Sequence, residues 1–325
     1  MDVPSFVAQS HVLIVAGKGG VGKTTMTAAV ASLAASAGRS VLIVELEGKS
    51  GITGAFGFAD DLGYDEVELV HPKDGGHGSV RARRITPDDA LVEYLIDHGL
   101  KRVSKRLVSS GVVDVVATAI PGIRDVLVLG KIKQLERDRV ADLIVVDAPA
   151  TGHAITFLTS ASGLVSAARG GPLRSQAQEV VDFLDDPQRC RVMLVTLPEE
   201  MPVSETIESA YLLEDKAGVQ LGPVIVNSCD PEPVGLYRPA QEVAAAQGPS
   251  VGEPLDATSL EALEAARRFR LQRHALSSEQ IARLAQELPL PQLLVPLLDV
   301  ESIGPAETES LSLALADAIA AMSDS

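Results

Sequence analysis

The 325-residue sequence contains few aromatic residues, few cysteines and fewer basic than acidic residues. Trp is absent, aromatic residues make up 3% of the chain, and the two cysteines, Cys190 and Cys229, belong to no Cys-x-x-Cys pair. These counts exclude a disulfide framework and a cysteine-based zinc site, and we expect two packed thiols in a reducing compartment. Since 46% of the residues are hydrophobic, Ala, Val and Leu must build the core.

Long apolar runs and an excess of positive charge are also missing. No run is long enough to cross a bilayer, and residues 1–6 do not resemble a secretory signal. The net charge of −16 argues against nucleic-acid binding and against attachment to anionic lipid. We interpret the basic clusters at 81–84, 101–106 and 267–273 as solvated helix faces. The sequence thus predicts a cytoplasmic protein with no nucleic-acid partner and no stable membrane insertion.

Short β-branched runs alternate with longer helical stretches along the chain. This order predicts an α/β fold with a mostly parallel central sheet and helices on both faces. The predicted strands are residues 12–16, 41–45, 142–147, 192–197, 223–227 and 292–296, with 80–85 as an added edge strand.

The other segments predict one domain, 1–325, with a helical layer over the ligand site. Residues 60–78 are Asp- and Gly-rich and predict a surface loop. Segments 86–138 and 153–190 are candidate helical or lid segments; the first is broken at Pro121-Gly122 and the second contains a glycine-rich lid at 163–175. Further helices are expected at 258–287 and 305–322.

Residues 17–25 read Gly-Lys-Gly-Gly-Val-Gly-Lys-Thr-Thr, between the first strand and a helical stretch beginning at Thr24. Strand, glycine loop and helix in this order predict a phosphate-binding loop, or P-loop. Backbone N–H groups and the helix dipole favour phosphate oxygens, Lys23 would reach the β- and γ-phosphates, and the Thr24 hydroxyl would bind Mg²⁺. The predicted nucleotide-binding residues here are Gly19, Gly20, Val21, Gly22, Lys23, Thr24 and Thr25.

A dinucleotide-binding loop is the competing interpretation of these glycines. Gly17, Gly19 and Gly22 also satisfy G-x-G-x-x-G. Glu45, at the end of the next apolar run, stands about where such a loop has the acidic residue that binds the ribose. That fold does not require a lysine and two threonines after the last glycine. We therefore favour a nucleoside triphosphate.

The apolar run 142–147 ends in Asp147 and is followed by Ala-Pro-Ala-Thr-Gly-His. P-loop enzymes keep the acid that holds Mg²⁺ at such a strand end. Gly152 could place its N–H against a γ-phosphate and sense its presence. The alternative is that Asp147 only caps the next helix.

Together, residues 17–25 and 147–153 resemble the arsenite-pump and tail-anchored-protein-targeting ATPases. These belong to the deviant Walker A class, which also contains the Min and Par ATPases. Further similarity extends over most of the chain, at 85–94, 121–125, 195–206 and 224–227. The resemblance implies a P-loop ATPase that binds ATP and Mg²⁺.

The resemblance also implies a dimer that encloses ATP, either a homodimer or a heterodimer with a paralogous ATPase. In it Lys18 would contact phosphate at the interface as a catalytic residue, and Asn227 would contact adenine. Closure on ATP would rearrange a helical surface and so control an unknown protein client.

Several family features differ here. The aspartate that orients the attacking water is replaced by Glu47, the second predicted catalytic residue. Three arsenite-binding thiols, the zinc-binding Cys-x-x-Cys and a long Met-rich insertion are all missing. Two alternatives stay open: a weakly hydrolysing subunit paired with a paralogue, suggested by Glu47, and a Min- or Par-type spatial organiser. The acidic charge, and a C-terminal 305–325 segment without Lys or Arg, count against the organiser.

Overall fold

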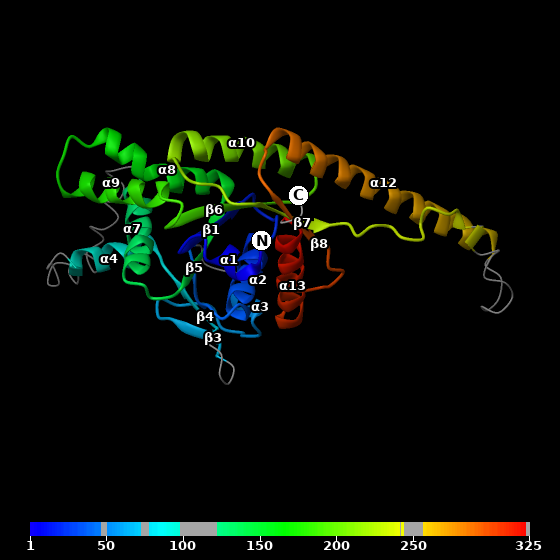
Figure 1. The fold of residues 1–325 in the computed structure, drawn as a ribbon, viewed down its shortest axis with the longest axis horizontal. Coiled ribbons are helices and arrows are strands. Elements are labelled where there is room, and N and C mark those ends of the chain that lie inside the picture. The colour runs from blue at the N-terminus through cyan, green and yellow to red at the C-terminus, as the bar shows by residue number, and fades with distance from the viewer. Residues whose placement is uncertain (47–50, 73–77, 98–121, 241, 244–255, 323–325) are drawn as a thin grey trace.

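The computed structural model describes residues 1–46, 51–72, 78–97, 122–240, 242–243 and 256–322 (Figure 1). An eight-stranded sheet with the order β3-β4-β2-β5-β1-β6-β7-β8 lies at the centre. All adjacent strands are parallel except β3 and β4, which are antiparallel. The predicted α/β class with a mostly parallel sheet is confirmed. The strands are β1 (Val12–Gly17), β2 (Ser40–Glu45), β3 (Val67–Val70), β4 (Ser79–Arg84), β5 (Leu143–Ala150), β6 (Cys190–Thr196), β7 (Val224–Cys229) and β8 (Gln292–Pro296).

Helices cover both faces of this sheet. On one face α1 (Val3–Val7), α2 (Lys23–Ser36) and α13 (Pro305–Ala321) pack against residues such as Val15, Ile43 and Val145. The opposite face, with Ile14, Leu42 and Val146, contacts α7 (Ile123–Arg137), α8 (Thr151–Ala167), α9 (Pro172–Asp185) and α10 (Glu200–Ala217). Because β1 is buried along its whole length, its sequence is apolar at almost every position rather than alternating.

The edge of the sheet differs from the prediction in two ways. Residues 80–85 were expected at the edge, but β4 pairs with β2 on one side and with β3 on the other. The edge strand is β3, inside the segment 60–78 that was predicted to be a loop. In β3 only Leu69 is buried, and Val67 is exposed. A four-residue strand with one buried side chain leaves too little periodicity to be recognised among Asp and Gly.

The predicted helical segments resolve into separate helices. Segment 86–138 contains α4 (Pro87–Asp97) and α7, while residues 98–121 lie outside the described part of the chain. The predicted lid at 163–175 is mostly helical, because α8 runs to Ala167 and α9 begins at Pro172. The predicted helices 258–287 and 305–322 correspond to α12 (Ala257–Glu287) and α13, and α3 (Ile52–Ala55) is a single turn.

The helix α12 has little contact with the body of the protein. It extends beyond the sheet (Figure 1), and of its 31 residues only Ser277 and Leu284 are buried. Its first residue is capped by Asp256, whose Oδ1 accepts a hydrogen bond from Ser259 N at 2.6 Å. Across the described ranges, no helix has the length and apolar character that a membrane span requires.

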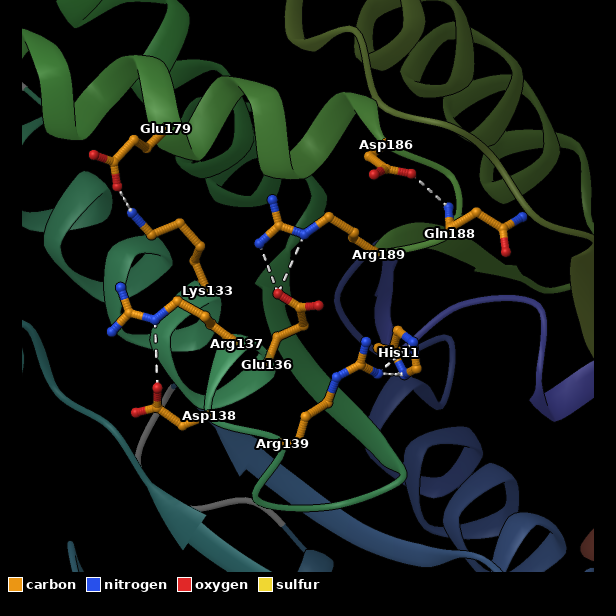
Figure 2. A network of polar contacts seen from close by, with 10 residues as sticks. All are labelled: His11, Lys133, Glu136, Arg137, Asp138, Arg139, Glu179, Asp186, Gln188 and Arg189. Carbon is orange, nitrogen blue, oxygen red and sulfur yellow. Dashed lines mark hydrogen bonds and ion pairs between the residues drawn. The ribbon is translucent and has the colours of Figure 1, made fainter.

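A polar network joins helices and strands at the amino ends of the central strands (Figure 2). Glu136 of α7 is 5% exposed and accepts two hydrogen bonds at Oε2 from Arg189, from Nε at 3.2 Å and from Nη2 at 2.7 Å. Lys133 pairs with Glu179 of α9, and Arg139 contacts the ring of His11 immediately before β1. These contacts fix α7 and α9 against the sheet at the end opposite the glycine loop.

Replacing Glu136 by Ala should lower the free energy of unfolding by about 2–3 kcal/mol, because the Arg189 guanidinium loses the buried carboxylate with which it pairs. Because the Arg189 side chain is partly exposed, the expected loss lies below the range of about 3–5 kcal/mol for a fully buried pair. Equilibrium urea unfolding measures the change. Arg137→Ala is the matched control, since its pair with Asp138 is exposed and should contribute less than about 0.5 kcal/mol. Equal losses in the two variants would contradict a structural role for the buried pair.

Candidate functional site

The glycine loop lies between the carboxyl end of β1 and the first turn of α2. Gly20 and Gly22 have φ angles of 86° and 90°, a left-handed conformation that side chains disfavour. A Cβ on Gly22 would also lie 2.4 Å from Asn227 Nδ2. Within the described residues no side chain caps α2, and its first turn holds no acidic residue. The amide groups of this helix start are arranged as in anion-binding loops.

Three predicted site residues come together at this helix start. Thr24 Oγ1 donates to Asp147 Oδ2 at 2.7 Å, and Thr27 Oγ1 lies 3.4 Å from Asp147 Oδ1. Lys23 Nζ folds back over the loop and donates to the Lys18 carbonyl at 3.1 Å. The alternative role of Asp147, capping the next helix, does not apply, because Ala150 is the N-cap of α8.

Burial raises the pKa of Asp147 from 3.8 to about 6. Hydrogen bonds from Thr24 and Thr27 and the charge of Lys23 limit the rise, and the charge of Glu45 adds to it. Across the described residues, no cluster of three His, Cys, Asp or Glu side chains could hold a metal ion. One hydroxyl and one carboxylate suit Mg²⁺, which keeps several waters and shares the phosphate oxygens of its substrate.

Asn227, two residues before the carboxyl end of β7, lies against the glycine loop. Its Nδ2 donates to the Val21 carbonyl at 2.9 Å, and its Oδ1 accepts from Ser228 N at 2.8 Å. The residue is 9% exposed. Asn227 therefore joins β7 to the loop, and its contact with adenine stays a prediction.

A cavity of about 620 Å³ adjoins this asparagine. It lies between the glycine loop, the turn after β6, the end of β7 and α12, and it is lined by Gly20, Gly22, Pro198, Asn227, Ser228, Arg273 and Leu276, among others. Arg273 Nε donates to Asp230 Oδ2 at 2.8 Å, and the Asp230 side chain is only 3% exposed. The ion pair attaches α12 to the segment that follows β7.

Lys18 contacts Lys23 through its carbonyl, whereas its side chain pairs with α10. Its Nζ is 2.6 Å from Glu205 Oε1 of α10, and the Lys18 side chain is 41% exposed. Gly152 is the second residue of α8, directly after β5, and a Cβ there would meet no atom within 4 Å. Glu47 lies outside the described residues, whereas Glu45 is buried at the end of β2.

The fold and this loop define a P-loop nucleotide-binding protein of the α/β class. The profile of the family described as anion-transporting ATPase matches residues 10–167. The chain is 38% identical over 250 residues to ATPase BagA of Mycobacterium tuberculosis. The aligned region covers 73% of this chain and 72% of the relative. The chain therefore belongs to the anion-transporting ATPase family, and it is an enzyme that hydrolyses ATP.

Two more distant relatives carry other names. The arsenical pump-driving ATPase of Escherichia coli is 27% identical over 239 residues, covering 70% of this chain and 37% of that protein. The ATPase get3 of Schizosaccharomyces japonicus is 29% identical over 174 residues, half of each chain. The resemblance inferred from residues 17–25 and 147–153 is confirmed.

Sequence reasoning missed three residues of this region. Glu205 and Arg273 are far from the loop in sequence, and no spacing pattern connects them with Lys18 or Asn227. Arg84, whose Nη2 lies 3.4 Å from Glu45 Oε1, was assigned to a solvated basic cluster. Its position at the end of a strand, opposite a strand-terminal acid, was the signal that could have revealed it.

Asp147→Asn should stabilise the metal-free, nucleotide-free protein at pH 8 and leave it nearly unchanged at pH 4. Because the folded-state pKa is about 6 and the ordinary value is 3.8, the folded protein binds the proton more tightly than the unfolded chain. The ionised carboxylate thus costs stability above pH 6, and this cost disappears as the pH falls towards 4. We expect a gain of about 1–3 kcal/mol at pH 8, measured by urea unfolding in EDTA.

Asp142→Asn is the control with the opposite sign. Hydrogen bonds from the Ser40 N–H and hydroxyl lower the pKa of Asp142, so its ionised form stabilises the fold. This stability is present above the ordinary value and is lost as the pH falls through the lowered folded-state pKa. Asp142→Asn should therefore destabilise at pH 8, and a gain there like that of Asp147→Asn would refute the assignment.

Proposed function

We propose that this ATPase uses Mg²⁺-ATP to close a dimer of P-loop chains, and that closure controls the binding of a protein partner. The observation that carries the proposal is the position of Lys18. The ammonium group of this phosphate-loop lysine pairs with Glu205 on α10, whereas Thr24 and Asp147 contact each other. An exposed cation at the rim of the site is free to turn towards phosphate when a second chain covers that rim.

In the proposed complex the loop amides from Gly19 to Thr25 hold the phosphates, and Lys23 pairs with the β- and γ-phosphates. Thr24 and Asp147 hold Mg²⁺, which neutralises phosphate charge when it is bound. The Gly152 N–H faces the γ-phosphate. Adenine is proposed to bind in the cavity beside Asn227, because the cavity is large enough for a base and the Asn227 amide can donate and accept hydrogen bonds.

Dimer closure would exchange one partner of Lys18 for another. In the single chain Lys18 is neutralised by Glu205, and a half-exposed pair of this kind contributes at most about 1 kcal/mol. A γ-phosphate carries more charge than one carboxylate, so Lys18 would leave Glu205 for it. The second chain of the dimer is either another copy or a paralogous ATPase.

The partner controlled by closure is proposed to be a protein, not an arsenic oxyanion. Cys190 begins β6 and Cys229 ends β7, so the two thiols lie at opposite ends of neighbouring parallel strands and cannot share a ligand. Both are free cysteines whose pKa is raised by burial. We place the reaction in the cytoplasm, where ATP is supplied.

Lys23→Ala should weaken ATP binding by roughly 100-fold, because it removes the cation that pairs with two phosphates. Lys18→Ala should change ATP affinity by less than about threefold and abolish ATP-dependent dimerisation and turnover. Titration with a fluorescent ATP analogue measures affinity, and sedimentation velocity with and without Mg²⁺-ATP measures the dimer. Lys216→Ala, in the last turn of α10, is the control. Equal losses of affinity in Lys18→Ala and Lys23→Ala would show that Lys18 is an ordinary binding residue.

Glu47→Gln should lower kcat by roughly 100-fold with little change in ATP affinity, because a carboxylate that orients water acts in the transition state. Steady-state phosphate release at saturating Mg²⁺ and ATP checks this. If Glu47→Gln turns over normally and Glu45→Gln is inactive at saturating Mg²⁺, the assignment is wrong by two positions. Slow turnover by the native chain that rises when a paralogue is added would favour the weakly hydrolysing subunit.

A further inference from the structure

One side of α12 lines the cavity beside Asn227. Arg273, Leu276, Ser277 and Gln280 all border this cavity, and residues spaced three, four and seven positions apart lie on one side of a helix. Ser277 is one of the two buried residues of α12, so this side faces the body of the protein. Leu276 lies on the same side and is nevertheless 54% exposed. The apolar surface of Leu276 is therefore available to a molecule bound in the cavity.

The cavity combines apolar and polar surfaces in the way that a nucleobase requires. Leucines from three elements line it: Leu197 after β6, Leu297 after β8 and Leu276 of α12. Asn227 and Ser228, near the end of β7, add polar groups. A flat aromatic ring has apolar faces and polar edges, so it can contact both kinds of surface.

The charges around the cavity favour the base over the phosphates. Glu199 and Glu200 line the cavity and are exposed. Among the described lining residues Arg273 is the one cation, and the buried Asp230 pairs with it. Two carboxylates disfavour a triphosphate in the cavity, whereas the amides of the adjoining glycine loop favour one. A nucleotide held by its phosphates on that loop would thus extend its uncharged base towards α12.

We propose that Leu276 packs against the base of the bound nucleotide, so that the base joins α12 to the glycine loop. The inference rests on the proposed function, because it requires a nucleotide whose phosphates are held by this loop. It adds α12, which no sequence motif connects with nucleotide binding, to the elements that hold the substrate. The contact acts on the base alone, because the burial of apolar surface favours binding without any interaction with phosphate.

The competing explanation is that Leu276 is an ordinary exposed leucine. Single apolar residues are common on protein surfaces and need no ligand. The two explanations differ in the effect of Leu276 on triphosphates with and without a base. A base contact strengthens the binding of ATP alone, whereas a surface leucine affects neither ligand.

The experiment compares a non-hydrolysable ATP analogue with inorganic tripolyphosphate, which has the phosphates without ribose and base. Titration calorimetry with Mg²⁺ measures both affinities. Leu276→Ala should bind the analogue about fivefold more weakly, because less apolar surface is buried against the base, and should bind tripolyphosphate within about twofold of the native chain. Phe269→Ala is the matched control, since Phe269 is 64% exposed on the same helix and is not among the described lining residues. A native affinity for the analogue in Leu276→Ala would overturn the inference.

A second measurement reports the contact directly. The native chain contains no Trp, so Leu276→Trp has a single indole at the proposed position. A purine stacked on this indole should quench its fluorescence by roughly half, whereas tripolyphosphate should not. Phe269→Trp is the control and should respond to neither ligand.

Two fluorescence results would contradict the base contact. One is unchanged emission of Leu276→Trp while calorimetry shows that the analogue is bound. The other is equal quenching by the analogue and by tripolyphosphate, because the phosphates alone would then account for the response. If the native chain binds neither the analogue nor tripolyphosphate, the proposed function fails instead.

Discussion

The contact between Thr24 and Asp147 joins the two halves of the nucleotide site. It connects the first turn of α2 to β5, across a sheet in which β5 pairs with both β1 and β2. Because the strands are parallel, the glycine loop after β1, Asp147, Glu45 and Asn227 all lie at the same edge. A shift of β5 by one residue would turn Asp147 to the opposite face and leave the Thr24 hydroxyl without this partner.

The sequence was sufficient to predict the parts of the site whose function depends on local order. The glycine loop, the following helix and Asp147, in the second half of β5, are close in sequence to the elements that position them, and their spacing along the chain predicts their chemistry. The central strands were equally recognisable, because burial on both faces makes them continuously apolar. The positions of Asp147 and Thr24 follow directly from these two signals.

What the sequence could not predict depends on distant contacts. Glu205 meets Lys18 across 187 positions, and Asn227 bonds to the loop at Val21 across 206. Arg84 and Glu45 become neighbours only through the register of β2 with β4, and β4 was thought to lie at the edge. The strand β3 was missed for a different reason, since a short edge strand buries too little to leave a pattern. Apart from β3, each failure concerns which segments are adjacent in space rather than which segments form helices or strands.

The attachment of α12 has a mechanical consequence. The helix is held at Arg273 by the buried Asp230, close to the cavity beside Asn227, and its first residues lie beyond the body (Figure 1). From Arg273 to Ala257 the helix runs about 24 Å, at 1.5 Å per residue. Within this stretch Arg267 donates to the Leu236 carbonyl and Glu264 accepts from Ala240 N, so part of the segment after β7 is attached to the helix. A rotation of α12 by about 10° about Arg273 would displace its first residue by about 4 Å, so an adjustment too small to disturb the sheet would become a displacement as large as an amino-acid side chain.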